Sequence, residues 1–216
     1  MGESTLPSDL RDSRSLGEWT QRAKRVDVVA AGDDMIEELE RTLDEGPPFH
    51  CPPEHALFVR ESAATLLGKI AITKAPGWRR RWLARTFRTL TNGPRAEVRS
   101  AWAKNLAFVD LDDGLRTRVA RMLDRETDPR AVRHLHALID PTLDHASDAE
   151  LLGMTSGADP TSRKVVYALL ERSASFGVLS ELRKRIPHET HPGALVVLTE
   201  SVRSLERELE DDADDG

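Results

Sequence analysis

Apolar residues recur at spacings of three and four along most of this chain, which is the pattern of amphipathic α-helices. Residues 94–128 show it most clearly, because two such stripes flank the helix-breaking segment Leu111-Asp112-Asp113-Gly114. Neither helix can bury its apolar face alone, so the pair requires similar neighbours on both sides. That requirement predicts a stack of helix pairs.

Similar pairs precede and follow that stretch. Helical stripes run through residues 19–30 and 35–43, 57–71 and 78–90, 98–109 and 115–123, 132–139 and 148–154, and 166–170 and 179–186. Asp128-Pro129 and Asp159-Pro160 each combine an N-cap residue with a proline at the first helical position. We therefore predict an all-α fold, an α–α superhelix (solenoid) of about five helix pairs.

A last helix is predicted from Pro192 to about Glu210. Its apolar seam, at alternating spacings of three and four, consists of Leu195, Leu198, Val202, Leu205 and Leu209. We expect this helix to cap the stack. The alternative is a short coiled coil that dimerises the protein, but the seam spans fewer than three heptads, so we expect a monomer.

The helical pattern also suggests the domain limits. We expect residues 15–210 to form a single domain. Residues 1–14 lack periodicity and contain Ser, Asp, Gly and Pro, which predicts a mobile leader, and the acidic residues 211–216 predict a disordered tail. The proline-rich segment 46–53 predicts a rigid connector between the first two pairs.

Charge is distributed unevenly along the chain. The net charge is −6 at pH 7, yet residues 60–133 contain 17 Lys or Arg against 8 Asp or Glu, while the remainder contains 14 against 29. The middle of the chain is therefore basic, and both ends are acidic. The excess of positive charge in residues 60–133 predicts that this part of the chain binds an anionic partner.

Cysteine content and hydropathy indicate the compartment. The single cysteine, Cys51, excludes an intramolecular disulfide and favours a reducing environment. No apolar run approaches the roughly 20 residues that a membrane span needs, and the first residues lack the apolar segment of a secretory signal. We expect a cytoplasmic protein that does not contact a membrane.

The first helices of four predicted pairs align on a short motif. It reads Val59-Arg60-Glu61-Ser62-Ala63, Val98-Arg99-Ser100-Ala101, Val132-Arg133-His134-Leu135 and, in degraded form, Ser162-Arg163-Lys164-Val165. This pattern resembles the HEAT-repeat superfamily, including its short bacterial and archaeal forms, over roughly residues 54–186. The resemblance implies a right-handed superhelix whose second helices line a concave face, and a role as a binding scaffold.

Arginines form a stripe on the second helix of two neighbouring pairs, at i, i+4, i+7 and at i, i+3, i+7. A HEAT-like stack implies that both stripes lie on the concave side, where like charges repel each other unless an anion binds. The predicted anion-binding residues are Arg81, Arg85, Arg88, Arg118, Arg121 and Arg125. The alternative is a solvated face whose arginines pair with nearby acids such as Asp124 and Glu126.

Catalytic and metal-binding motifs are not found. The sequence has no nucleophile elbow, phosphate-binding glycine loop or HExxH motif. His50, Cys51 and His55, and also His188 and His191, lack the spacing of metal ligands, so we expect no metal and no cofactor. We predict a non-enzymatic scaffold that binds an acidic protein segment through its basic surface.

Nucleic-acid binding stays open as the main alternative. Trp78, Trp82 and Trp102 lie near the arginine stripes and offer rings for base stacking, although tryptophans at helical spacing commonly belong to a core. The HEAT-like alkylpurine DNA glycosylases are the closest enzymatic resemblance, through fold and charge only, because their catalytic aromatic and aspartate positions have no match here. In a third hypothesis, the acidic ends fold back over the basic middle.

Overall fold

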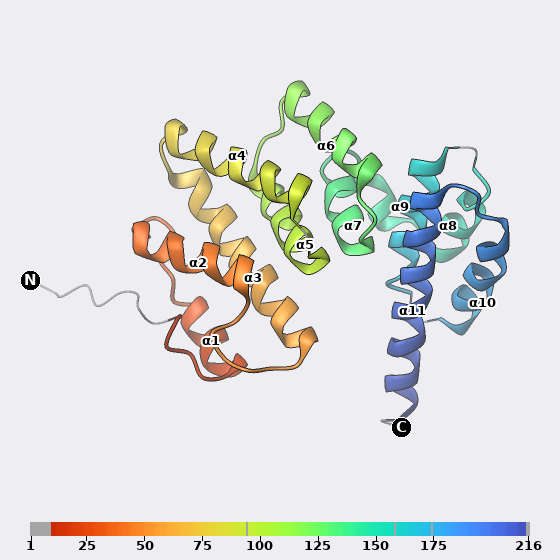
Figure 1. Cartoon of the computed structure of the whole chain (residues 1–216), viewed down its shortest axis with the longest axis horizontal. Helices are drawn as coiled ribbons and strands as arrows, with labels where there is room; N and C mark the ends of the chain where they lie inside the picture. The colour runs from red at the N-terminus through yellow and green to blue at the C-terminus, as the bar shows by residue number, and fades with distance from the viewer. Residues whose placement is uncertain (1–9, 94, 158, 174, 215–216) are drawn as a thin grey trace, which may run out of the picture. The chain divides into compact units, whose positions relative to one another are not determined.

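The computed structural model describes residues 10–93, 95–157, 159–173 and 175–214. Within these ranges the chain forms eleven α-helices, three short 3₁₀ helices and no strand (Figure 1). Several helices that are adjacent in sequence pack against one another, as they do in helical-repeat proteins. The predicted all-α, solenoid-like fold class is confirmed.

The helices follow the predicted order along the chain. They are α1 (Leu16–Ala23), α2 (Asp33–Glu45), α3 (Pro53–Thr73), α4 (Pro76–Asn92), α5 (Ala96–Asn105), α6 (Asp113–Arg125), α7 (Pro129–Ala137), α8 (Asp148–Met154), α9 (Pro160–Leu170) and α10 (Phe176–Arg185). The final helix is α11 (Pro192–Asp214). The 3₁₀ helices are η1 (Leu106–Phe108), η2 (Pro141–His145) and η3 (Ile186–His188).

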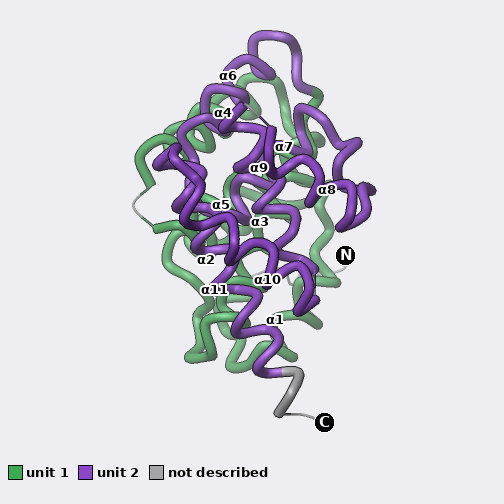
Figure 2. The backbone as a smooth tube through the Cα atoms, turned by 90° about the vertical axis from the view of Figure 1, so that its right-hand side faces the viewer, with its two compact units in different colours: residues 1–110 green, residues 111–216 purple. Residues whose placement is uncertain are grey.

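The chain divides into two compact units, residues 1–110 and 111–216 (Figure 2). The division falls between α5 and α6, so the first unit contains α1 to α5 and the second contains α6 to α11. The expectation of a single domain over residues 15–210 stays a prediction.

In the first unit, α3 is the central helix, against which α1, α2, α4, α5 and η1 pack. Its buried residues are Val59, Arg60, Ala63, Ala64, Leu67, Gly68, Ile70 and Ala71. Gly68 permits the close approach of η1, because a Cβ at that position would lie 2.3 Å from Phe108 Cδ2. Small residues along α3 therefore let several helices surround it.

In the second unit, α9 is the central helix, and α7, α8 and α11 pack against it. All residues from Lys164 to Leu170 are buried. The apolar seam of α11 is also buried within this single chain, at Leu198, Val202, Leu205 and Leu209. Burial of the seam within the chain agrees with the expectation of a capping helix.

Both Asp-Pro segments begin helices as predicted. Asp128 Oδ1 accepts a hydrogen bond from the backbone N–H of Ala131 at 2.8 Å, before α7. Asp159 Oδ2 accepts one from the backbone N–H of Ser162 at 2.7 Å, before α9. Each carboxylate satisfies an N–H group that has no partner inside its own helix.

The ends of the chain differ from the expectation where the structure describes them. Residues 1–9 of the expected leader lie outside the described residues, but Leu10 is only 1% exposed and Ser13 only 3%, so this part packs on the first unit. Helix α11 continues to Asp214, which makes part of the expected tail helical. An existing helix extends at low cost into acidic residues that would not start one. Residues 215 and 216 lie outside the described residues.

Candidate anion-binding surfaces

The arginine of the aligned Val-Arg motif binds the end of the preceding helix. Arg60 Nη1 donates to the carbonyl oxygen of Leu43 in the last turn of α2. Arg99 Nη1 donates to Gly93 O after α4 at 2.9 Å, and Arg163 Nη1 donates to Gly157 O after α8 at 2.8 Å. Carbonyls at a helix end lack partners within the helix, and the positive charge complements the helix dipole. The motif therefore joins successive pairs.

The motif arginine of α7 departs from this pattern. Arg133 Nη1 donates to Ala168 O in α9 at 2.9 Å and also pairs with Glu171. The end of α6 is bound instead by Lys164, whose Nζ donates to Leu123 O and, at 2.9 Å, to Asp124 O. Burial lowers the pKa of Lys164. These basic residues hold helices together, a role that the sequence alignment did not reveal.

Helix α4 has a basic exposed face. Its seventeen residues include five arginines and no acid, and Arg80, Arg81 and Arg88 are exposed. Arg79 turns back instead, and its Nη2 donates to Ile72 O at 2.9 Å at the end of α3. We call Arg80, Arg81 and Arg88 the α4 arginine face. None of these three pairs with a carboxylate among the described residues.

Arg85 is turned away from the expected outer stripe. Its Nη2 lies 2.9 Å from Asp44 Oδ2, and its Nη1 pairs with Glu40, so both partners come from α2. Its guanidinium carbon lies 5.6 Å from the ring centroid of Trp102 in α5. The same Asp44 accepts the indole N–H of Trp102 through Oδ1 at 3.0 Å. Arg85 therefore joins α4 to α2 and α5, because their acidic and aromatic groups satisfy its charge.

In the second unit, Arg118, Arg121 and Arg125 of α6 are all exposed, and we call them the α6 arginine face. Their acidic neighbours hold helix ends. Asp124 Oδ1 accepts the hydroxyl of Thr161 at 2.8 Å, and Glu126 Oε1 accepts the backbone N–H of Thr127 at 2.9 Å. The two arginine faces belong to different units, and their alignment on one concave side stays a prediction.

The three tryptophans considered for base stacking differ in exposure. Trp82 is 2% exposed and Trp102 is fully buried, so both are core residues. Trp78 is half-buried and stacks on Trp82, with ring centroids 6.3 Å apart and planes inclined by 13°. Of the three, only Trp78 presents part of its ring to solvent.

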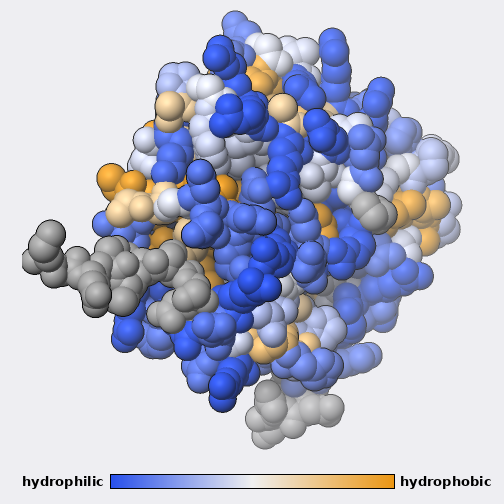
Figure 3. All heavy atoms as spheres, turned by 60° about the vertical axis from the view of Figure 1, so that its left-hand side comes forward, coloured by the Kyte–Doolittle hydropathy of each residue, from blue (hydrophilic) through white to orange (hydrophobic). Residues whose placement is uncertain are grey.

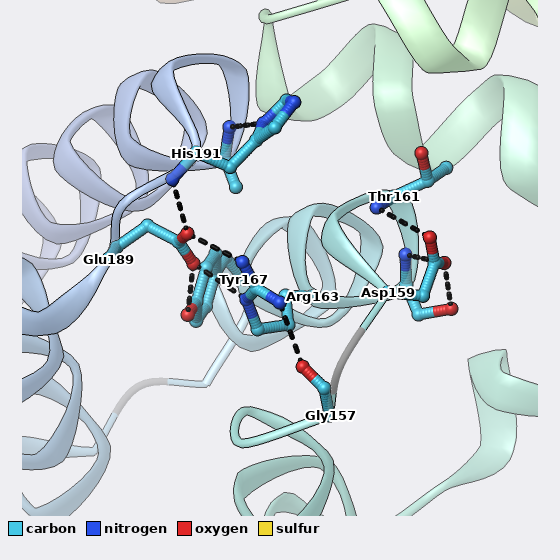
Figure 4. Close-up of polar contacts among 9 residues, drawn as sticks. Gly157, Asp159, Thr161, Arg163, Tyr167, Glu189 and His191 are labelled. Atoms are coloured by element: carbon cyan, nitrogen blue, oxygen red, sulfur yellow. Dashed lines mark hydrogen bonds and ion pairs between the residues drawn. The ribbon is translucent and has the colours of Figure 1, made fainter.

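A dense polar cluster surrounds Glu189 in the second unit (Figure 4). Arg163 donates from Nε to Oε2 at 2.8 Å and from Nη2 to Oε1 at 2.7 Å. The hydroxyl of Tyr167 donates to Oε2 at 2.9 Å, and the backbone N–H of His191 donates to Oε1 at 2.9 Å. The bonds from Arg163 lower the pKa of Glu189 to about 2, and burial raises the pKa of Tyr167 to about 12. Because both oxygens accept two bonds, this cluster fixes α9 to the segment before α11.

In the part of the chain that the structure describes, no group of three or more His, Cys, Asp or Glu is arranged to hold a metal ion. No helix in the same ranges combines the length and the apolar composition that crossing a membrane requires.

No protein-family model, curated protein or solved structure matches the chain. The resemblance to HEAT repeats therefore stays a prediction, based on the aligned motif and the succession of helix pairs.

Proposed function

We propose that the protein is a non-enzymatic helical-repeat scaffold that binds an acidic segment of a protein partner through the α4 arginine face. One observation carries the proposal: Arg80, Arg81 and Arg88 are exposed on a helix that contains no acidic residue. Neighbouring positive charges repel one another, and bound carboxylates relieve that cost. In this proposal the α6 arginine face of the second unit provides a further contact region.

An acidic peptide fits this surface better than a nucleic acid does. The whole chain carries a net charge of −6, which opposes the approach of a long polyanion. In the first unit, α2 also exposes the acidic residues Asp33, Asp34, Glu37 and Glu45. A short acidic segment needs to contact only the arginines, whereas an extended phosphate backbone also meets repulsive groups.

Nucleic-acid binding is the second candidate, and Trp78 is the observation that favours it. Its half-buried ring precedes Arg80 and Arg81 in the same helix. Aromatic rings beside basic residues are typical of surfaces that bind single strands, since bases stack on the ring while arginines contact phosphates.

Fluorescence anisotropy with a glutamate-rich peptide and with random single-stranded and duplex oligonucleotides separates the candidates. Reversal of the α4 arginine face (R80E, R81E and R88E together) should weaken peptide binding about tenfold or more, or about 1.4 kcal/mol. The matched control R11E, K24E and R25E changes the same net charge at exposed residues of the same unit and should bind normally. Tight binding of oligonucleotides but not of peptide would favour the second candidate, and binding of neither would refute both.

A further inference from the structure

Two apolar side chains are exposed in one region of the first unit. Val29 is 72% exposed and Ile72 is 52% exposed. The loop that contains Val29 packs on the end of α3, because Lys74 Nζ donates to Ala31 O and Thr73 Oγ1 lies 3.4 Å from Val28 O. Val29 and Ile72 therefore lie close to the same helix end.

Exposed apolar residues of this size are few. On the face of the molecule in Figure 3, the surface is mostly hydrophilic and hydrophobic residues form small separate patches. Single exposed apolar side chains are normal in soluble proteins, whereas neighbouring ones next to charged groups are typical of binding sites. Val29 and Ile72 both lie near the end of α3, to which Arg79 of α4 is bonded.

Arg79 connects this apolar region to the α4 arginine face. Its Nε and Nη2 donate to Ala71 O and Ile72 O at 3.3 and 2.9 Å, so the start of α4 is fixed to the end of α3. Arg80 and Arg81 follow immediately and are exposed. Exposed apolar and cationic residues thus both occur where α3 passes into α4.

We infer that this surface binds an acidic amphipathic segment, whose carboxylates pair with Arg80 and Arg81 while its apolar side chains cover Ile72 and Val29. The inference rests on the proposed function and names the class of its partner. A purely acidic segment satisfies the arginines but leaves the apolar side chains in water. Apolar burial adds affinity, and salt does not screen that contribution.

The first unit already binds one segment of this chemistry, which is its own α2. Helix α2 buries Ile36, Leu39 and Leu43 on its apolar side. Beside them, Glu40 and Asp44 stand one helical turn apart and both pair with Arg85 of α4. An acidic amphipathic helix is therefore the kind of element that an arginine of α4 demonstrably accepts.

The test titrates the full chain with three peptides of equal charge: an acidic amphipathic helix, a scrambled version of it, and polyglutamate. V29S combined with I72S should weaken binding of the amphipathic peptide about tenfold and leave polyglutamate unchanged. Both side chains are exposed, so the fold is retained. F58S is the matched control, since Phe58 is 50% exposed on the same helix about four turns earlier, and it should bind like the wild type.

The outcomes distinguish this inference from the proposed function. Equal affinity for the amphipathic and scrambled peptides, or an unchanged affinity of the serine variant, overturns the inference while polyglutamate binding keeps the proposed function intact. Absence of binding to all three peptides overturns both. Binding to phosphatidylserine vesicles but to no peptide would also contradict the inference, because it would assign the surface to anionic lipid.

Discussion

Helix ends stabilise the buried cations Arg60 and Lys164. Arg60, 5% exposed, and Lys164, 2% exposed, donate to terminal carbonyls of α2 and α6, and burial lowers the pKa of both. A buried charge is costly unless it is hydrogen-bonded, and the negative end of a helix dipole compensates part of that cost. Basic residues at such positions therefore stabilise the packing of the helices and are not free to bind a partner.

The Glu189 carboxylate accepts four hydrogen bonds in the second unit, so its loss should destabilise the folded state. E189Q should lower the free energy of unfolding by about 2–4 kcal/mol at pH 7, because it leaves Arg163 without its counter-charge. Urea unfolding followed by circular dichroism measures this change. E200Q is the control, because the Glu200–Arg203 pair is exposed, and its effect should stay within about 0.5 kcal/mol.

The same carboxylate predicts a pH dependence. The pKa of Glu189 is about 2 in the folded chain against 4.5 ordinarily, so the unfolded chain takes up the proton first as the pH falls. Its stabilising contribution is therefore complete above the ordinary value and is lost as the pH falls towards the folded value. Wild type should lose more stability than E189Q over that interval, and parallel curves for the two proteins would contradict this assignment.

At the scale of elements, local sequence signals predicted most of the fold. The helix pairs followed from apolar spacing, and the starts of α7 and α9 followed from Asp128 and Asp159, because capping involves residues three positions apart. The orientation of Arg85, by contrast, could not be predicted from such local signals. Its partners Glu40 and Asp44 are more than forty positions away in sequence, so its orientation depends on tertiary packing that periodicity does not encode.

The end of α2 provides a prediction at this scale. Gly46 has φ of +105°, and a Cβ there would lie 2.9 Å from Arg60 Nη2. G46A should therefore destabilise the first unit by about 1–3 kcal/mol, through backbone strain and displacement of Arg60. Thermal unfolding measures the effect. G77A, in the first turn of α4 with nothing within 4 Å, should be neutral or slightly stabilising, and equal losses for both variants would refute this explanation.

At the scale of the whole molecule, acidic and basic residues are separated along the chain. Acidic residues predominate at both ends and basic ones in the middle, and Glu40 and Asp44 of α2 pair with Arg85 of α4. The hypothesis that the acidic ends fold back over the basic middle stays a prediction. The sequence identified five of the six exposed arginines that form the two faces. It missed Arg80, because the predicted stripe was drawn through Arg85, which the structure turns toward α2.

The most direct test of the account is a charge swap on the α4 arginine face, measured by isothermal titration calorimetry with an acidic peptide and its lysine counterpart. We predict that wild type binds the acidic peptide only, whereas R80E, R81E and R88E together reverse this preference, with helicity by circular dichroism unchanged. If the variant still binds the acidic peptide as tightly as wild type does, the α4 arginine face is not the binding surface.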